Sequence, residues 1–306
     1  MSDAETVHLV MVYRDLSLDI EDFEKIARRV RQVAGHIRVF LQRDEMPSPA
    51  LLDELAVHRT FVFSPIQLGA FHVRRGCVFA GRPMQKSEQL LRLQLAGVPV
   101  PMWTSLDRGK RFDPDVWGDY VVLKPEIGSR ARGVRIIKTE TLNDRTSAIA
   151  SYRRDGDNFI VQQMIRNESL GKLRIHTLFD RILYSRLYRF SEPAKFETEA
   201  DIHQYEKLFQ TDSNISEYYE SEEIFAVARR CGNCFDGVPM LGLDILMDEA
   251  GKPWFLEANP GGNTWHFSST LRGRILREKG VFLETQFDAF NLCGELLVLK
   301  SNELAV

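Results

Sequence analysis

The sequence predicts a fold that is α/β at its beginning and α+β in the remainder, and three observations carry this prediction. Short apolar strands alternate with an amphipathic helix over residues 1 to about 80, which is typical of an open α/β sheet. Strand pairs joined by tight turns then dominate residues 120–260. One of these pairs is apolar on one face and carries carboxylates on the other. We therefore expect an open sheet followed by sheets built from hairpins.

The first part of the chain contains three candidate strands and one helix. Residues 7–12, 36–40 and 60–63 are short apolar runs, and a loop with Pro47 and Pro49 follows the second of them. Residues 20–33 have apolar side chains spaced as on one helix face, at Phe23, Ile26, Ala27 and Val30. No glycine-rich loop follows the first strand, which weighs against a dinucleotide-binding fold.

A helix is predicted from about Met84 to Leu95, because Gly97 and the prolines after it end any helical pattern. Lys86 lies in its first turn, where the helix dipole disfavours a cation. Either Lys86 pairs with the nearby Glu88 or it binds a ligand, and the sequence leaves both interpretations open.

A basic hairpin is predicted over residues 120–138. Its first strand ends at Lys124, and Gly128 and Gly133 bracket a tip that carries Ser129, Arg130 and Arg132. Backbone N–H groups, a hydroxyl and positive charge together can hold a phosphate. A solvent-exposed basic hairpin is the alternative. A further helix is expected at about 143–153.

Two further segments suggest ligand contacts. The strand 159–165 has an apolar run interrupted by Gln162 and Gln163, and the backbone of Met164 and Ile165 could bond an adenine edge. A hairpin about Asp180 then brings four basic residues near one another, although residues three apart in a strand lie on opposite faces. These four are Lys172, Arg174, Arg186 and Arg189. Arginines in this place could bind a transferring phosphoryl group, or they could be solvated.

The hairpin from Leu241 to Thr264 carries the strongest chemical signal. If it folds about Ala250 and Gly251, Asp244 lies directly opposite Glu257, and Asn259 shares their face. Opposed carboxylates repel, and a divalent cation with oxygen ligands such as Mg²⁺ removes that cost. A solvated acidic face is the alternative. The other face is predicted to carry Leu243, Ile245, Met247, Trp254, Leu256 and Ala258.

Composition limits the class of protein. The chain has 306 residues and a net charge of −3, which argues against a nucleic-acid surface. We see neither a signal peptide nor a membrane span, and the four cysteines suit a reducing compartment, so a cytoplasmic protein is expected. The acidic stretch 191–219 is predicted to be a long loop, and a helix at about 282–299 is predicted to close the chain.

The order of these segments resembles the ATP-grasp superfamily, and most closely its ribosomal-protein glutamate-ligase and glutathione-synthetase types. The resemblance covers residues 80–265. It implies an N-terminal α/β subdomain (1–98) and two α+β subdomains (99–165 and 166–306) that hold ATP between them. It places the phosphates on Lys86, Lys124 and the loop Gly128, Ser129, Arg130 and Gly133, and the adenine at Gln163, Met164 and Ile165. It places magnesium on Asp244, Glu257 and Asn259, and the acyl-phosphate at Arg174 and Arg189.

The resemblance implies an ADP-forming carbon–nitrogen ligase. Such an enzyme joins a carboxylate to an amine through an acyl-phosphate, using ATP and Mg²⁺ (two ions, with Mn²⁺ as a substitute). The expected partners are small carboxylate and amine substrates, such as an amino acid or a small peptide, and a second copy of the chain in a homodimer. Nucleic acid and membranes are not expected partners. The alternatives are an ATP-grasp kinase of a small molecule and a nucleotide-binding regulatory protein without turnover.

Overall fold

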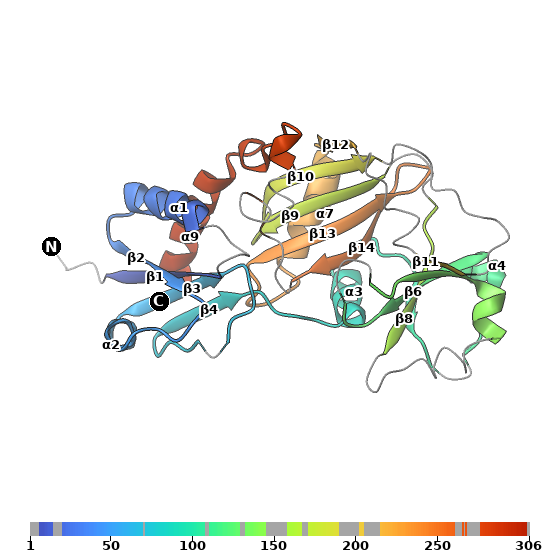
Figure 1. The fold of residues 1–306 in the computed structure, drawn as a ribbon, viewed down its shortest axis with the longest axis horizontal. Helices are drawn as coiled ribbons and strands as arrows, with labels where there is room; N and C mark the ends of the chain where they lie inside the picture. Colours follow the sequence, from blue (N-terminus) through green and yellow to red (C-terminus); the bar gives the residue numbers. More distant parts are fainter. Residues whose placement is uncertain are drawn as a thin grey trace.

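Three β-sheets lie in a row along the long axis of the molecule (Figure 1). The computed structural model describes residues 6–14, 20–69, 71–107, 110–128, 132–144, 158–166, 171–189, 202–204, 215–260, 265, 267 and 276–304. The sheets are named by their order in the sequence: the N-terminal sheet has four strands, and the central and C-terminal sheets have five each. In Figure 1 the C-terminal sheet lies between the other two. The mixed α/β and α+β architecture predicted from the sequence is confirmed.

The N-terminal sheet is parallel and ordered β2–β1–β3–β4, as an open α/β sheet requires. Its strands are β1 (Val7–Tyr13), β2 (Ile37–Arg43), β3 (Arg59–Ser64) and β4 (Gly76–Ala80). Helix α1 (Ile20–Val33) buries the four apolar residues that the periodicity predicted. The loop predicted around Pro47 and Pro49 is correct for residues 44–48 and wrong at Pro49, where helix α2 (Pro49–Val57) begins. Ser48 caps α2 by accepting a hydrogen bond from Leu51 N, and proline is favoured in the first turn.

The central sheet is antiparallel and ordered β11–β7–β6–β8–β5. The predicted basic hairpin supplies β6 (Tyr120–Pro125) and β7 (Arg135–Lys138), and the adenine-strand candidate supplies β8 (Phe159–Gln163). The short strands β5 (Trp103–Ser105) and β11 (Ile202–Gln204) form its edges, and helix α4 (Pro114–Trp117) precedes β6. The described chain is helical over 139–144, so most of the helix predicted at 143–153 falls outside the described residues.

The C-terminal sheet is antiparallel, with the order β12–β10–β9–β13–β14. Its strands are β9 (Lys172–Leu178), β10 (Arg181–Arg189), β12 (Ile215–Tyr218), β13 (Met240–Met247) and β14 (Pro253–Asn259). Helix α7 (Glu222–Gly232) packs on β9, β10 and β13, and helix α3 (Lys86–Leu95) packs on β14 (Figure 1). The apolar face of the sheet is thereby buried, so its polar face is the one left for chemistry.

Two sequence predictions near the end of the chain are wrong in part. Residues 191–219 contribute strands β11 and β12, so this stretch is not a single loop. The closing helix begins later than predicted: a 3₁₀ turn, η1 (Leu283–Thr285), comes first, and helix α9 runs over Ala289–Leu304. Asp288 has a φ of 51°, in the left-handed region, and this interrupts the helical backbone immediately before α9.

The predicted subdomain boundaries are crossed by three elements. Helix α9 packs against α1 of the N-terminal sheet, where Arg29 and Glu295 form an ion pair. Helix α3, from the predicted subdomain 1–98, packs on β14 of the C-terminal sheet. Strand β11, from the predicted subdomain 166–306, pairs with β7 of the central sheet. The division into 1–98, 99–165 and 166–306 therefore stays a prediction.

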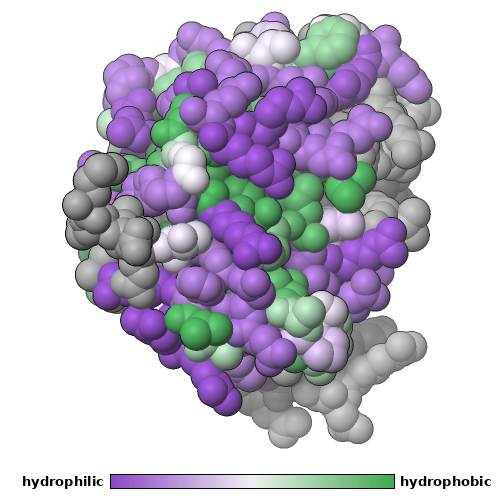
Figure 2. Space-filling view, turned by 90° about the vertical axis from the view of Figure 1, so that its left-hand side faces the viewer, coloured by the Kyte–Doolittle hydropathy of each residue, from purple (hydrophilic) through white to green (hydrophobic). Residues whose placement is uncertain are grey.

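Figure 2 shows the face of the molecule at the end where the N-terminal sheet lies. This face is hydrophilic around its margin, and apolar residues gather in its middle. Over the described part of the chain, no helix is both long enough and apolar enough to cross a membrane.

Candidate active site between the central and C-terminal sheets

Three oxygen-bearing side chains converge on the polar face of the β13–β14 hairpin. Asp244 lies directly opposite Glu257, and Asn259 lies opposite Gly242, as the sequence predicted. The Asn259 amide nitrogen is 3.4 Å from Glu257 Oε1 and 3.5 Å from Asp244 Oδ2. This nitrogen also donates to Gly242 O at 2.9 Å, so the hairpin gathers two carboxylates and an amide on one face.

The register of this hairpin differs from the prediction near its turn. Asp248 accepts hydrogen bonds from Ala250 N and Lys252 N, so the turn centres on Ala250. A bulge at Leu256 then offsets this shift, because Ile245 pairs with Phe255 while Asp244 still pairs with Glu257. The predicted apolar face is wrong at Trp254 and Leu256, which are only partly buried, and Phe255 is fully buried in their place.

Basic side chains of the neighbouring strand hold Asp244. Arg174 lies opposite Asp244 across β9 and β13, with Nη1 2.6 Å from Oδ2, and Lys172 Nζ is 3.0 Å from Oδ1. Burial alone would raise the pKa of Asp244, but the charges of Arg174 and Lys172 together lower it well below its usual value. Asp244 is therefore ionised at any pH at which the protein would work.

Gly242 makes room for this arrangement. A Cβ atom at residue 242 would lie 2.5 Å from Nη2 of Arg174 and 3.1 Å from Nε2 of His176. The guanidinium of Arg174 therefore occupies the space that any other residue at position 242 would fill.

Arg186 extends the same row of side chains, and the sequence prediction chose Arg189 instead. Arg186 pairs with Arg174 on one side and Tyr218 on the other, is fully buried, and stacks with its guanidinium carbon 4.1 Å from the centre of the Tyr188 ring. Arg189 ends β10, and its side chain lies outside the described part of the structure. Counting symmetrically about Asp180 pairs residue 174 with residue 186, so the sequence contained this signal.

Two lysines near these carboxylates are buried: Lys124 belongs to the central sheet, and Lys86 belongs to helix α3. Lys124 lies in β6, and its surroundings lower its pKa to about 8. Burial is the main cause; Lys86 and Lys172 add to the shift, whereas Glu257 and Asp244 oppose it. These charges act on Lys124, so the carboxylates of one sheet lie within electrostatic reach of the lysine of the other.

Lys86 is buried and contacts the basic hairpin instead of its neighbours on helix α3. Its Nζ atom donates to the carbonyl of Gly128 at 3.3 Å, whereas Glu88 pairs with Arg92 at 2.9 Å. The first turn of α3 is fixed to the base of the basic hairpin, because Ser87 N donates to Glu126 Oε2. The structure therefore does not contain the ion pair between Lys86 and Glu88, which was one of the two interpretations of Lys86.

For the remaining candidate residues, in the loop 128–133 and at 163–165, the structure gives mainly the position of the backbone. Gly128 and Gly133 bracket the basic tip, and Gly133 has a φ of 76°, in the left-handed region that favours glycine. Ser129 and Arg130 lie outside the described residues. Gln163 is the last residue of β8, where its N–H donates to Met102 O at 2.8 Å. Met164 and Ile165 follow it outside the strand and are partly buried.

The residues of this site suit magnesium and a phosphate group. The candidate metal ligands offer only carboxylate and amide oxygens, which are the donors that Mg²⁺ prefers. Opposite them stand lysines, which bind phosphate oxygens as point charges. The donor set therefore fits a magnesium–triphosphate complex between the two sheets.

Comparison with known proteins assigns the fold. No family model matches the sequence, and no curated protein matches it. Solved structures do match over nearly the whole chain, and they are ATP-grasp ligases. The chain has the ATP-grasp fold, and the fold expected from the sequence is confirmed.

Three of these structures illustrate the likeness. D-cycloserine synthetase DcsG has a TM-score of 0.55 and 15% sequence identity, covering 95% of this chain and 99% of its own. The ATP-grasp ligase PsnB, complexed with a precursor peptide and AMPPNP, has a TM-score of 0.55 and 15% identity, covering 98% and 99%. The macrocyclase MdnC from Microcystis aeruginosa, bound to precursor peptide MdnA, has a TM-score of 0.53 and 13% identity, covering 95% and 99%.

Proposed function

We propose that this chain is an ADP-forming carboxylate–amine ligase that makes an amide or peptide bond through an acyl-phosphate. The observation that carries the proposal is the site itself. Asp244 and Glu257 on one sheet stand within electrostatic reach of the buried Lys124 on another. The ATP-grasp fold supports the same interpretation, because the similar structures are ligases of this fold.

In this proposal the facing elements bind ATP. Lys86, Lys124 and the loop 128–133, with Ser129 and Arg130 at its tip, bind the phosphates. The adenine lies against Gln163, Met164 and Ile165, where the chain leaves strand β8 and its backbone groups can bond the base. The subdomains 99–165 and 166–306 hold the nucleotide between them.

Asp244, Glu257 and Asn259 would hold the magnesium, as two ions, with Mn²⁺ as a substitute. When bound, the metal neutralises charge on the phosphate oxygens. Asp244 keeps its ion pairs with Arg174 and Lys172, so these cations stay fixed beside the reacting groups. This fixed charge lowers the barrier, since preorganised donors need no rearrangement during the reaction.

The reaction then has two steps. A carboxylate oxygen of the first substrate attacks the γ-phosphorus of ATP, and ADP leaves. The amine of the second substrate attacks the acyl carbon, phosphate leaves, and the amine loses a proton as the amide forms. Arg174 stabilises the acyl-phosphate with Arg189, and we add Arg186 because it lies beside Arg174 on the same strand pair.

We propose an amino acid or a small peptide as substrate. PsnB and MdnC are complexed with precursor peptides, and the amide-forming chemistry of the proposed site suits such carboxylates and amines. No specific observation favours the kinase over the ligase.

A pairwise screen tests the proposal. Amino acids and small peptides are incubated in pairs with ATP and Mg²⁺, phosphate release is measured, and the products are analysed by mass spectrometry. We expect phosphate release that requires both an acid and an amine, with a product lighter than the two substrates by one water. Phosphate transferred to a hydroxyl would identify a kinase, and ATP binding without ADP formation would identify a regulatory protein.

The variant E257Q separates the metal site from the rest of the fold. Loss of this carboxylate should reduce turnover by about 100-fold or more, the usual effect of removing a group that stabilises transition-state charge. The matched control E249Q changes an exposed glutamate in the turn of the same hairpin and should leave turnover unchanged. Full activity in E257Q would refute the metal assignment.

A further inference from the structure

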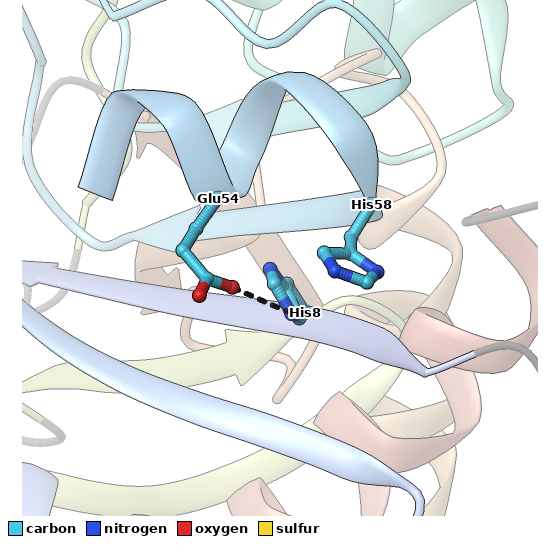
Figure 3. A group of neighbouring side chains, drawn as sticks. All are labelled: His8, Glu54 and His58. Atoms are coloured by element: carbon cyan, nitrogen blue, oxygen red, sulfur yellow. Dashed lines mark ion pairs between the residues drawn. The ribbon is translucent and has the colours of Figure 1, made fainter. Parts of the chain in front are cut away.

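A second cluster of metal-ligating side chains lies in the N-terminal sheet, apart from the site between the other two sheets. His8 is in β1, Glu54 is in α2, and His58 immediately follows α2 (Figure 3). One ligand atom from each residue lies within 4.8 Å of the other two. Glu54 and His58 are four residues apart, which places both over the same part of β1.

His8 is the unusual member of this cluster. Its side chain is fully buried, and neither ring nitrogen has a hydrogen-bond partner within the described part of the chain. Glu54 Oε2 lies 3.8 Å from Nε2, which is too far for a hydrogen bond. The His58 ring lies 4.3 Å away, centre to centre. Buried polar nitrogens are rarely left without a partner, so this arrangement needs a reason.

The imidazole of His8 is in the chemical state that a metal requires. Burial lowers its pKa to about 4, with a further decrease from His58, although Glu54 acts in the opposite direction. At neutral pH the ring is therefore neutral, and one nitrogen carries a free lone pair. Only the neutral imidazole can coordinate a metal.

We propose that His8, Glu54 and His58 bind a divalent transition metal, for which Zn²⁺ is the best fit. Two imidazole nitrogens and one carboxylate oxygen form a recognised zinc ligand set, and a water completes the tetrahedron. This set differs from the oxygen-only ligands of Asp244 and Glu257, so the two sites select different ions.

The geometry permits this with small movements. Zinc bonds of about 2.0–2.1 Å in a tetrahedron place ligand atoms about 3.4 Å apart, and the His8–Glu54 distance of 3.8 Å is already close to this value. His8 is fixed in the sheet, whereas the Glu54 side chain is 38% exposed and His58 is partly buried. We therefore expect the two more exposed ligands to close on the buried one, with the metal entering from their exposed side.

Arg38 currently occupies part of the site. It lies beside His8 on the neighbouring strand β2, and its Nη1 atom is 3.1 Å from Glu54 Oε2. Its side chain is 56% exposed, so it can turn into solvent when a metal takes the carboxylate. The metal would then connect α2 directly to β1 and stabilise the N-terminal sheet.

Zinc binding to the full chain tests the proposal. The metal-free protein is titrated with Zn²⁺ by calorimetry in excess Mg²⁺, and its melting temperature is recorded with and without zinc. We expect one Zn²⁺ per chain and a rise in melting temperature of about 5 °C at a hundredfold excess over Kd. H58Q should weaken binding by at least about tenfold, the lower end of the effect of losing even a supporting residue of a metal site. E54Q should weaken it likewise, and R38Q should strengthen it.

Two matched variants locate the site. H72Q changes an exposed histidine elsewhere in the N-terminal part, and E257Q removes a carboxylate of the other site. Both should bind zinc like the unaltered chain. The proposal would be overturned if the unaltered protein bound no zinc. It would also be overturned if H58Q bound zinc with unchanged affinity while its melting temperature without metal, which shows that the variant is folded, was unchanged. Loss of zinc binding in E257Q would also overturn the zinc proposal, because the zinc would then bind at the other site, and this outcome would leave the ligase proposal standing.

Discussion

At the scale of single residues, Lys124 is a buried group whose charge state changes near pH 8. Its ordinary pKa of 10.5 falls to about 8, mainly because burial penalises the ammonium form. Lys124 is therefore mostly charged at neutral pH and loses its charge as the pH rises through about 8. The unfolded chain binds more protons between these two values, so this lysine reduces stability below pH 8, and the cost diminishes as the pH rises toward 10.5.

ATP binding should follow this titration. If the charged form binds the phosphates, the Kd for ATP should be constant below about pH 7 and rise by up to about tenfold per pH unit above 8. K124R stays charged over this range, so its Kd should be weaker but independent of pH. Calorimetric titration of ATP across the pH range measures both profiles. A similar rise of Kd in K124R would show that another group is responsible.

At the scale of elements, a row of charged side chains crosses the C-terminal sheet. Arg186, Arg174, Asp244 and Glu257 occupy paired positions on four neighbouring strands. Paired positions lie on the same face of a sheet, so the four charged side chains are neighbours on one face. The backbone pairing, rather than any single contact, aligns the proposed phosphate-binding and metal-binding groups.

G242A should disturb this row without unfolding the sheet. The added Cβ would lie 2.5 Å from Arg174 Nη2 and would push the guanidinium away from Asp244. We expect a loss of stability of about 1–3 kcal/mol and a fall in kcat that can reach about 100-fold, because small displacements at a reacting centre are costly. Steady-state kinetics and thermal melting measure the two effects.

Gly35 provides the control for this substitution, because a Cβ at residue 35 meets nothing within 4 Å. G35A should leave kcat unchanged. If G242A also retained its kcat and KM, the position of Arg174 would not matter for the reaction.

At the scale of the whole molecule, the end of the chain returns to its beginning. Helix α9 packs on α1, and Trp265 Nε1 donates to the buried Asp22 Oδ2 of α1 at 2.9 Å. The C-terminal sheet is therefore anchored to the N-terminal sheet by the segment that follows β14. This anchoring lies on the side of the C-terminal sheet that is turned away from the central sheet (Figure 1).

The close approach of α9 and α1 depends on Gly294. A Cβ there would lie 2.7 Å from Arg29 Cγ and 3.3 Å from Ile26 O. G294V should therefore destabilise the protein by about 2–3 kcal/mol through overpacking. E295Q, which removes only the exposed ion pair with Arg29, should cost less than about 1 kcal/mol. Chemical denaturation measures both values, and equal losses would show that the ion pair, rather than the packing, holds α9.

The sequence by itself determined the features that depend on neighbouring strands. Asp244 and Glu257 are separated by one short turn, so their pairing follows from counting residues, and the shifted turn and the bulge at Leu256 cancel. The open α/β sheet at the start of the chain and the place of Lys124 at a strand end also follow from local patterns. Turn geometry and period-two alternation act locally, and a single sequence records them.

Only the tertiary structure decided which distant groups meet. Lys124 stands within reach of Glu257, Lys86 contacts Gly128 rather than Glu88, and Arg186 is buried beside Arg174. The cluster of His8, Glu54 and His58 also depends on how α2 lies across β1. These contacts join segments whose separation is set by the packing of whole sheets and helices. Local sequence patterns do not contain that information, because the free energy that fixes it comes from the buried core.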